Sequence, residues 1–385
     1  MLSDYLEYSQ TQESPTLYHT WVAISMVAAC LERNVWLDRG FYKVFPNLYT
    51  MLIGDSAIYK KSTCVEMGKD LLYELDDKPV MYEGQITIPS LIKEIGGEKK
   101  DMVTGAYVPN SRILLLAPEL SVFLRDDTQA REIIYFLTDF YTGKTKPWKK
   151  TTVTSVTAEI HSPCINFLGC STAEWLAIGL STADFGGGFM GRCLFVVPTY
   201  PPKRIAHPEV TDAQRAARER VVGKLRHIRT LRGEFGLSGE AREFYQNWYT
   251  NRPTVSAADR LRSYYERKAE NVLKLGIIKA AMDNADEVGV VELQWGLSAL
   301  NALEPSMPQA FQFIGTDENV LAELVIAHLT LNHGKDSYVH VLNFMGPRLK
   351  GFQQFENVLG MLIRQEKIRR VSNGAADMLC LKNVD

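Results

Sequence analysis

The sequence has no apolar stretch long enough to cross a bilayer. Its longest apolar run, Val22–Leu31, has ten residues and includes Ser25, whereas a membrane-spanning helix needs about 20. The opening residues, MLSDYLEYSQ, carry acids where a secretory signal has bases, and they lack an apolar centre. We therefore expect a cytoplasmic protein that does not contact membranes.

The chain also lacks a strong net charge and any cysteine motif. It has 43 basic and 45 acidic residues, a net charge of −2, so DNA could be contacted only by local patches. No two of the six cysteines show the two-residue spacing of a zinc knuckle or a redox pair, and no set of zinc ligands or carboxylates places primase or nuclease chemistry in the chain. We interpret the cysteines as buried free thiols of a reducing compartment; they are Cys30, Cys64, Cys164, Cys170, Cys193 and Cys380.

Length and composition indicate a globular protein of several domains. The chain has 385 residues, 46% of them apolar and 23% charged, which is typical of folded rather than disordered proteins. We expect a helical segment over residues 1–45, an α/β core over 46–202, a helical region over 203–315 and a separate unit over 316–385. Residues 3–35 are predicted to be helical from the spacing of their apolar positions.

The core shows alternating strands and helices. Asn47–Ile53 is predicted as a buried strand, Gly54–Lys60 as a loop and Ser62–Leu75 as a helix. Helical segments lie between several of the further apolar runs, which predicts a parallel sheet with helices on both faces. Those runs are ILLLA (113–117), CINFLG (164–169) and CLFVV (193–197).

The chain after Pro202 changes character. Residues 203–232 contain nine Lys or Arg and three acids, and one interpretation is a solvated basic helix. Residues 238–304 are predicted as further helices, with no clear strand, and we expect them to form a helical lid. The last seventy residues are predicted as three helices, with a turn at 332–335, followed by two short strands joined through Ser372, Asn373 and Gly374, the pattern of a winged helix.

The segment GDSAIYKKST, Gly54–Thr63, has the features of a phosphate-binding P-loop. Such a loop binds phosphates through backbone N–H groups at a helix N-terminus, a lysine reaches the β and γ phosphates, and a hydroxyl binds magnesium. Lys61 and Ser62 match the last two roles. Lys60, however, stands where the pattern has its second glycine, and five residues rather than four separate it from Gly54. The nucleotide-binding candidates are Gly54, Asp55, Ser56, Ala57, Ile58, Tyr59, Lys60, Lys61, Ser62 and Thr63.

Glu119 is the candidate for a catalytic carboxylate. It follows the strand at 113–117, and an acid at the tip of a strand beside a P-loop can bind magnesium or orient an attacking water. Pro118 stands where a magnesium-supporting aspartate is usual. The alternative is a strand that merely ends in Pro-Glu.

Taken together, the motifs resemble a known family, the phage and prophage P-loop ATPases of the replicative helicase and primase-helicase type, related to the AAA+ and hexameric-helicase class. The resemblance spans most of residues 13–280. It rests on ESPTLYHTWVAISMVAACLERNVWL (13–37), PNLYTMLIGDSAIYKKST (46–63), ILLLAPELSVFL (113–124), PCINFLGCSTAEWL (163–176), GGGFMGRCLFVVP (186–198) and SYYERKAENVLKLG (263–276).

The resemblance implies an AAA+/RecA-like P-loop NTPase fold that uses ATP and Mg²⁺. Lys61 and Ser62 would bind the phosphates and the magnesium, and Glu119 would be the acidic residue of the second Walker element. Ser171 or Thr172 would be the polar sensor of the γ-phosphate.

Two arginines receive roles from the same resemblance. Arg192 would be an arginine finger that one subunit presents to the ATP of its neighbour in a ring, usually a hexamer, where it stabilises transition-state charge. Its alternative is a surface arginine at a strand end. Arg267, on the predicted lid helix, would be a second sensor.

Two places have residue types suited to DNA. In GKTKPWKKTT (143–152), four lysines surround Trp148 and could neutralise phosphates while the indole stacks on a base; a solvated lysine loop is the alternative. In the last unit, helix 352–367 and the adjoining strand present amides and arginines that suit base edges and phosphates. Residues 316–385 hold eight bases and eight acids, so a protein-binding winged helix is equally consistent. The candidates are Lys144, Lys146, Trp148, Lys149, Lys150, Gln353, Gln354, Asn357, Arg364, Arg369 and Arg370.

Three functions are compatible with these features. The first is an oligomeric, DNA-dependent ATPase of phage or mobile-element replication, a helicase-like motor that moves on single-stranded DNA, has double-stranded DNA as a further partner and works with replication partner proteins. The second is an initiator, helicase loader or regulatory switch that binds ATP and hydrolyses it slowly. The third is a DNA- or protein-binding scaffold with a decayed P-loop.

Overall fold

The computed structural model describes most of the chain, which divides into two compact units. The described residues are 1–84, 87–123, 127–143, 147–150, 158–173, 175–176, 188–256, 261–311, 317–346, 349, 351–372 and 377–382. One unit comprises Met1–Thr172 and Ala183–Ala310, and the other comprises Ala173–Thr182 and Phe311–Asp385.

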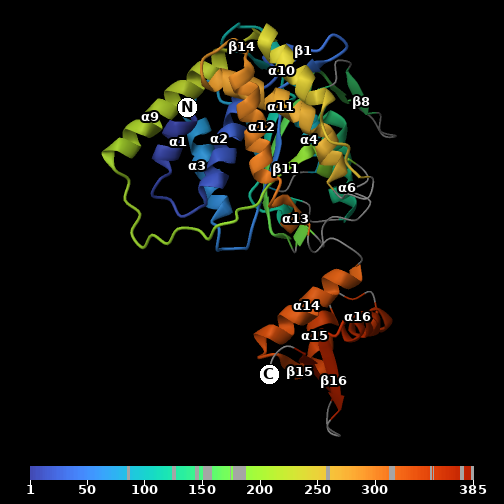
Figure 1. Cartoon of the computed structure of the whole chain (residues 1–385). Coiled ribbons are helices and arrows are strands. Elements are labelled where there is room, and N and C mark those ends of the chain that lie inside the picture. Colours follow the sequence, from blue (N-terminus) through green and yellow to red (C-terminus); the bar gives the residue numbers. More distant parts are fainter. Residues whose placement is uncertain are drawn as a thin grey trace. The chain divides into compact units, whose positions relative to one another are not determined.

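A five-stranded parallel sheet, flanked by helices, is the centre of the first unit (Figure 1). The three strands nearest its middle are almost fully buried, which explains their continuous apolar sequences. This confirms the predicted mixed α/β core with a parallel sheet. The strands, in sheet order, are β11 (Cys193–Val196), β3 (Tyr49–Ile53), β10 (Cys164–Ser171), β7 (Arg112–Ala117) and β4 (Val80–Glu83).

The edge strand β4 was not predicted. Its sequence, VMYE, is only half-buried, whereas the strand at the opposite edge, β11, is fully buried. Such a short, partly polar run has neither the alternation nor the apolar length that identifies a strand from sequence.

The register of the sheet determines which residues meet at the two ends of its strands. We call the side of the sheet where the parallel strands end the carboxyl edge, and the side where they begin the amino edge. Ile53 of β3 pairs with Ser171 of β10, and Gly169 of β10 pairs with Ala117 of β7. The carboxyl ends of these three strands therefore lie side by side. Cys193, the first residue of β11, pairs with Tyr49, the first residue of β3, so the residue before Cys193 lies at the opposite, amino edge.

The N-terminal region contains two helices and a strand, so the prediction of helix over residues 3–35 is wrong in detail. Helix α1 spans Leu2–Tyr8, helix α2 spans Thr16–Leu31 and strand β1 spans Val35–Asp38. Pro15 occupies the N-cap of α2, where its missing N–H costs no helical hydrogen bond but prevents the helix from continuing back toward α1. Helix α2 is buried over nearly its whole length because it packs against α3, α1 and the sheet.

The remaining elements of the first unit are helices and short two- or three-stranded sheets. The helices are α3 (Lys61–Tyr73), α4 (Ile88–Ile95), α5 (Leu120–Phe123), α6 (Asp127–Phe140), η1 (Met190–Arg192), α9 (Asp212–Thr230), α10 (Gly239–Thr250), α11 (Arg262–Met282), α12 (Val290–Leu303) and α13 (Met307–Ala310). The short strands are β2 (Lys43–Val44), β5 (Glu98–Lys100), β6 (Tyr107–Pro109), β8 (Trp148–Lys150), β9 (Ala158–Ile160), β12 (Gly233–Glu234), β13 (Gly236–Leu237) and β14 (Glu287–Val288). None of the described helices combines the length and apolarity that a membrane span requires.

The basic residues of α9 bind acids of the same chain. Arg220 Nε and Lys224 Nζ lie 2.9 and 2.8 Å from the carboxylate of Asp4 in α1. The buried Arg229 lies 3.0 Å from Glu32, at the end of α2. Much of the positive charge of residues 203–232 therefore joins helices to one another, so this segment is not simply a solvated basic helix.

Among its described residues from Asp317 onward, the second unit has three helices and a three-stranded antiparallel sheet in the order β15-β17-β16. Apolar residues of α14, α15 and α16, among them Val325, Val341 and Phe355, form its own core. The three helices, the turn at residues 332–334 and both C-terminal strands agree with the sequence prediction, whereas β15, which directly follows the turn, was not predicted. The elements are α14 (Asp317–Leu331), β15 (Lys335–Ser337), α15 (Tyr338–Met345), α16 (Phe352–Arg364), β16 (Ile368–Ser372) and β17 (Asp377–Leu381).

Candidate functional site

The loop between β3 and α3 is wound in a conformation that L-residues rarely adopt. Ala57 and Lys60 have φ angles of 60° and 48°, both in the left-handed region. Lys60 is the N-cap of α3, and the first helical hydrogen bond runs from Cys64 N to Lys60 O at 3.2 Å. The chain thus makes, with lysine, the left-handed turn that glycine makes more easily.

Lys61, the first residue of α3, folds back over this loop. Its Nζ donates to the backbone oxygen of Gly54 and, at 3.1 Å, to that of Asp55. The first turn of α3 contains no acid, so no side chain of that turn neutralises the positive end of the helix dipole. Ser62 and Thr63 are exposed at the same helix end. An ammonium, a hydroxyl and backbone N–H groups therefore meet at one place, a combination that suits a phosphate.

The N-terminal segment supports the loop from behind. The Ser14 hydroxyl donates to Lys60 O at 2.8 Å, and the Tyr18 hydroxyl donates to Ile53 O at 2.6 Å. A Cβ at Gly54 would lie 2.5 Å from the Tyr18 hydroxyl, so only glycine fits there. The ring of Tyr59 stands edge-on to Tyr18, with centroids 6.2 Å apart. Ser14 and Tyr18 were not predicted as supports of the loop, because they lie more than thirty residues before it.

A polar cavity of about 420 Å³ borders Ser14. His19 contributes to its wall and is itself buried, with Nδ1 3.3 Å from Cys64 Sγ and Nε2 3.1 Å from Gln12 Oε1. Burial, with a smaller effect of the Lys203 charge, lowers the pKa of His19 to about 4, so the ring is neutral at pH 7. The cavity is lined by Leu6, Glu7, Ser9, Gln10, Ser14, Thr16, His19 and Lys203.

Glu119 lies near the same edge of the sheet as Lys61. It is exposed after β7, and its Oε1 accepts a hydrogen bond from Ser121 Oγ at 2.9 Å. Both charges act on Cys170, the penultimate residue of β10: burial raises the pKa of this thiol to about 12, Lys61 opposes the rise and Glu119 adds to it. The carboxyl edge therefore brings Lys61 and Glu119 to either side of β10.

Ser171 and Thr172 extend this edge between the loop and Glu119. The backbone oxygen of Ser171 accepts from Gly54 N at 3.2 Å. The Ser171 hydroxyl donates to Thr172 O at 3.2 Å. Both candidates for a phosphate sensor thus lie beside the first residue of the loop.

Arg192 lies at the other end of the sheet. It directly precedes β11, whose first residue pairs with the first residue of β3, while the loop follows the last residue of β3. Five strand residues at about 3.3 Å each separate Arg192 from the start of the loop by roughly 17 Å along the strand direction. Arg192 Nη1 donates to Gly188 O at 2.6 Å, and its buried Nε has no hydrogen-bond partner among the described residues.

The structure places Arg267 beside Arg192, not beside Lys61. Burial lowers the pKa of Arg192, and the Arg267 charge lowers it further. A third cation, the buried Lys274, donates to Asn47 O and Oδ1 at 3.0 Å and lies 3.8 Å from the centroid of the Tyr141 ring. Lys274 was not predicted as a site residue, since the sequence of a helix does not show that a lysine within it is buried.

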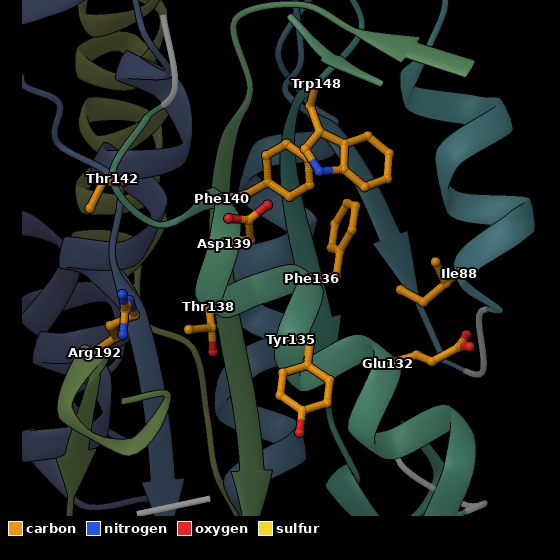
Figure 2. A pocket seen from close by; sticks show the side chains of 10 residues that line it. All are labelled: Ile88, Glu132, Tyr135, Phe136, Thr138, Asp139, Phe140, Thr142, Trp148 and Arg192. Carbon is orange, nitrogen blue, oxygen red and sulfur yellow. The ribbon is translucent and has the colours of Figure 1, made fainter. Parts of the chain in front are cut away.

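An open pocket of about 590 Å³ adjoins Arg192 (Figure 2). Figure 2 shows the rings of Phe136, Phe140 and Trp148 gathered together, apart from Arg192. The Trp148 centroid is 5.4 Å from that of Phe140 and 6.3 Å from that of Phe136. The lining residues are Ile88, Glu132, Tyr135, Phe136, Thr138, Asp139, Phe140, Thr142, Trp148 and Arg192.

The predicted lysine-rich loop is partly a strand. Trp148–Lys150 form β8, which pairs antiparallel with β9, and the half-buried indole packs on α6. Lys144 and Lys146 lie outside the described residues, as do the side chains of Lys149 and Lys150.

The DNA candidates of the second unit divide into exposed and internally bound residues. Gln353, Asn357 and Arg364 are exposed on α16, and Arg369 is exposed on β16, while Gln354 is half-buried. Arg370 is also exposed, but it lies 2.6 Å from Asp377 and stacks over the Tyr338 ring at 4.4 Å. Arg370 therefore stabilises the unit itself, because its charge is already paired.

Comparison of the chain with protein-family models found no match, and a search of curated proteins likewise found none.

Proposed function

We propose that the chain binds ATP with Mg²⁺ at the carboxyl edge of the five-stranded sheet and hydrolyses it. The observation that carries this proposal is the position of Lys61, whose ammonium lies on the backbone oxygens of Gly54 and Asp55 at the N-terminus of α3. The connection from β3 to β4 and the connection from its neighbour β10 to β11 also run in opposite directions across the sheet, and ligands of open parallel sheets bind where neighbouring strands differ in this way.

Each residue of this edge has a chemical role in the proposal. Lys61 binds the β and γ phosphates, displacing its contacts with the loop oxygens. Ser62 and Glu119 offer one hydroxyl and one carboxylate to Mg²⁺, whose other ligands are phosphate oxygens and water, as is usual for this ion. Bound Mg²⁺ neutralises charge that develops on the phosphates. Glu119 also orients the attacking water.

The cavity beside Ser14 is the proposed place for the rest of the nucleotide. It borders the residue whose hydroxyl binds Lys60 O. Its polar wall, with the neutral His19 ring and the Lys203 side chain, suits a ribose or a base better than it suits a purely apolar ligand.

Arg192 supports an oligomeric site. Because it lies at the amino edge of the sheet, it does not reach the nucleotide of its own chain, but a neighbouring chain could present it to that nucleotide. We propose a closed ring, with heterologous contacts between copies. Its work would be helicase-like movement on single-stranded DNA in phage or mobile-element replication, with residues 203–315 as the lid and the second unit as a winged helix that binds duplex DNA or a replication partner.

A second candidate function is a slow ATP-dependent switch, an initiator or helicase loader. Pro118 precedes Glu119 where a second acid would support magnesium, and Glu119 is exposed and hydrogen-bonded to Ser121. Both features favour slow hydrolysis over rapid cycling.

The first experiment is ATP hydrolysis by the full chain with and without single-stranded DNA, in wild type and Lys61→Ala. We expect hydrolysis that DNA stimulates and that Lys61→Ala abolishes, while Lys93→Ala, which removes an exposed lysine of α4, retains it. Full activity in Lys61→Ala contradicts the proposed site. DNA-insensitive, slow turnover identifies the switch, and failure of any nucleotide to raise the unfolding midpoint identifies the scaffold.

The oligomeric site is tested by mixing two inactive variants. Lys61→Ala and Arg192→Ala should each lose at least about 10³-fold in turnover. In an equimolar mixture, about a quarter of the interfaces combine an intact Lys61 with an intact Arg192 from the next chain, so activity should return. If Arg192 acts within its own chain or only stabilises the fold, the mixture stays inactive. Matching unfolding midpoints of both variants and wild type serve as the control for folding.

A further inference from the structure

Three metal-ligating side chains meet in the second unit, at the junction of α14, β15 and α15. Nε2 of His328 and Nδ1 of His340 both lie 2.8 Å from the same oxygen, Oδ2 of Asp336. Among the described residues, the ligand atoms of these three side chains all lie within 4.8 Å of one another. No zinc ligands were predicted from the sequence, because the spacing of seven and three intervening residues matches none of the motifs with two close pairs.

The surrounding contacts fix each ligand in direction. The second carboxylate oxygen of Asp336 accepts from Ser337 N at 2.7 Å, which leaves Oδ2 toward the two rings. The His328 ring stacks on Phe344 with centroids 4.2 Å apart. Asn332 Nδ2 donates to His328 O at 2.8 Å and lies 3.2 Å from His328 Nε2. The Ser337 and Phe344 contacts orient Asp336 and His328 before a metal arrives, which raises affinity, whereas the Asn332 amide must turn away from Nε2 when the ion binds.

The ring nitrogens that face Asp336 Oδ2 are the atoms that would bind an ion. Without an ion, either nitrogen can carry a proton and donate it to Oδ2. A divalent ion displaces these protons, and each nitrogen then binds it through its lone pair.

We propose that His328, Asp336 and His340 bind one divalent transition-metal ion, with Zn²⁺ as the preferred occupant. Two imidazole nitrogens and one carboxylate suit Zn²⁺ better than Mg²⁺ or Ca²⁺, which prefer oxygen ligands. Bonds of about 2.0–2.2 Å to all three atoms require only small side-chain shifts from the present distances. Water occupies the fourth position.

The site is open to solvent on one side and buried on the other. The His340 side chain is 65% exposed, whereas those of Asp336 and His328 are 15% and 10% exposed. The ion can therefore enter past His340. Once bound, it joins a helix, a strand and a second helix of a small unit, so that part of its binding free energy stabilises the fold.

The test is metal binding by the full chain after treatment with a chelator. We expect one Zn²⁺ per chain by titration calorimetry, and visible d–d absorption of a four-coordinate ion with Co²⁺ as the probe. His340→Ala should weaken Zn²⁺ binding by at least about tenfold and abolish the Co²⁺ bands; because His340 is exposed, this variant should fold. Asp336→Asn should act in the same direction.

His333→Asn is the matched control, since it removes an exposed neighbouring histidine, and asparagine tolerates the positive φ of 56° at this position. It should bind Zn²⁺ like wild type. Absence of stoichiometric binding, or Zn²⁺ binding that is unchanged in His340→Ala, overturns the proposal and leaves a hydrogen-bonded His–Asp–His cluster. The result does not depend on the nucleotide site.

Discussion

The backbone at Lys60 shows how a lysine serves where a P-loop pattern has glycine. Its φ of 48° is sterically unfavourable for any residue with a Cβ. The conformation is maintained by its neighbours: the Lys60 oxygen accepts from both the Ser14 hydroxyl and the first helical N–H of α3. The side chain at this position is therefore replaceable, while the backbone turn is required for Lys61 to reach the loop.

Replacement of Lys60 by glycine should stabilise the protein. Glycine adopts the left-handed conformation without strain, and we expect the free energy of unfolding to rise by about 1 kcal/mol, less the larger entropy of glycine in the unfolded chain. Denaturant titration of the two variants Lys60→Gly and Lys60→Ala measures the difference. Alanine keeps the strain and removes the charge, so equal stability of both variants would show that strain at this position is not important.

The contact between α2 and α3 depends on an uncharged histidine. His19 of α2 bonds to Cys64 in the first turn of α3 and to Gln12. The charged and titratable groups around the ring are Lys203, Cys64, Tyr5, whose ring centroid lies 5.9 Å away, and Glu7, which lines the same cavity. Burial disfavours an imidazolium most, and the Lys203 charge adds to this effect, so the helix contact requires the neutral ring.

Stability should therefore fall as the pH falls below the pKa of an unfolded histidine. The unfolded chain binds a proton near pH 6.5, whereas the pKa of His19 in the folded protein is about 4. Between pH 7 and pH 5 this difference removes about 2 kcal/mol of the free energy of unfolding. His19→Gln should lack this contribution, and urea titrations at both pH values measure it. An equal loss in the variant and in wild type would assign the pH dependence to other groups.

At the scale of the whole molecule, the chain has two separate hydrophobic cores. The first unit is built around the buried strands β3, β10 and β7. The second has its own core from α14, α15 and α16. The proposed ligands divide in the same way, since ATP would bind the first unit and Zn²⁺ the second.

We expect two unfolding transitions in scanning calorimetry of the full chain. Because a ligand raises the midpoint only of the unit that it binds, ATP with Mg²⁺ should raise one midpoint and Zn²⁺ the other. Lys61→Ala should remove the first shift alone, and His340→Ala the second alone. A single transition that both ligands raise would show that the two units unfold cooperatively.

Much of the local structure could be predicted from the sequence. The strand, loop and helix around residues 47–75 are local patterns, since an apolar run, a turn and a helical period each involve neighbouring residues. The same is true of the helices and the last two strands of the second unit. The edge strand β4 and the short strand β15 could not be predicted, because neither has a strand pattern in its own few residues. Each is a strand only because it pairs with residues far along the chain.

The sequence by itself determined the composition of the sheet strands, the chemistry available at residues 54–63 and the acid at the end of β7. Only the tertiary structure decided what these residues meet. The parallel register places Lys61 and Glu119 at one edge and Arg192 at the other, and the folding of α14 and α15 around β15 brings His328 to His340. The reason is physical: spacing along the chain determines local geometry, whereas packing and strand order determine the distances between residues that are far apart in sequence.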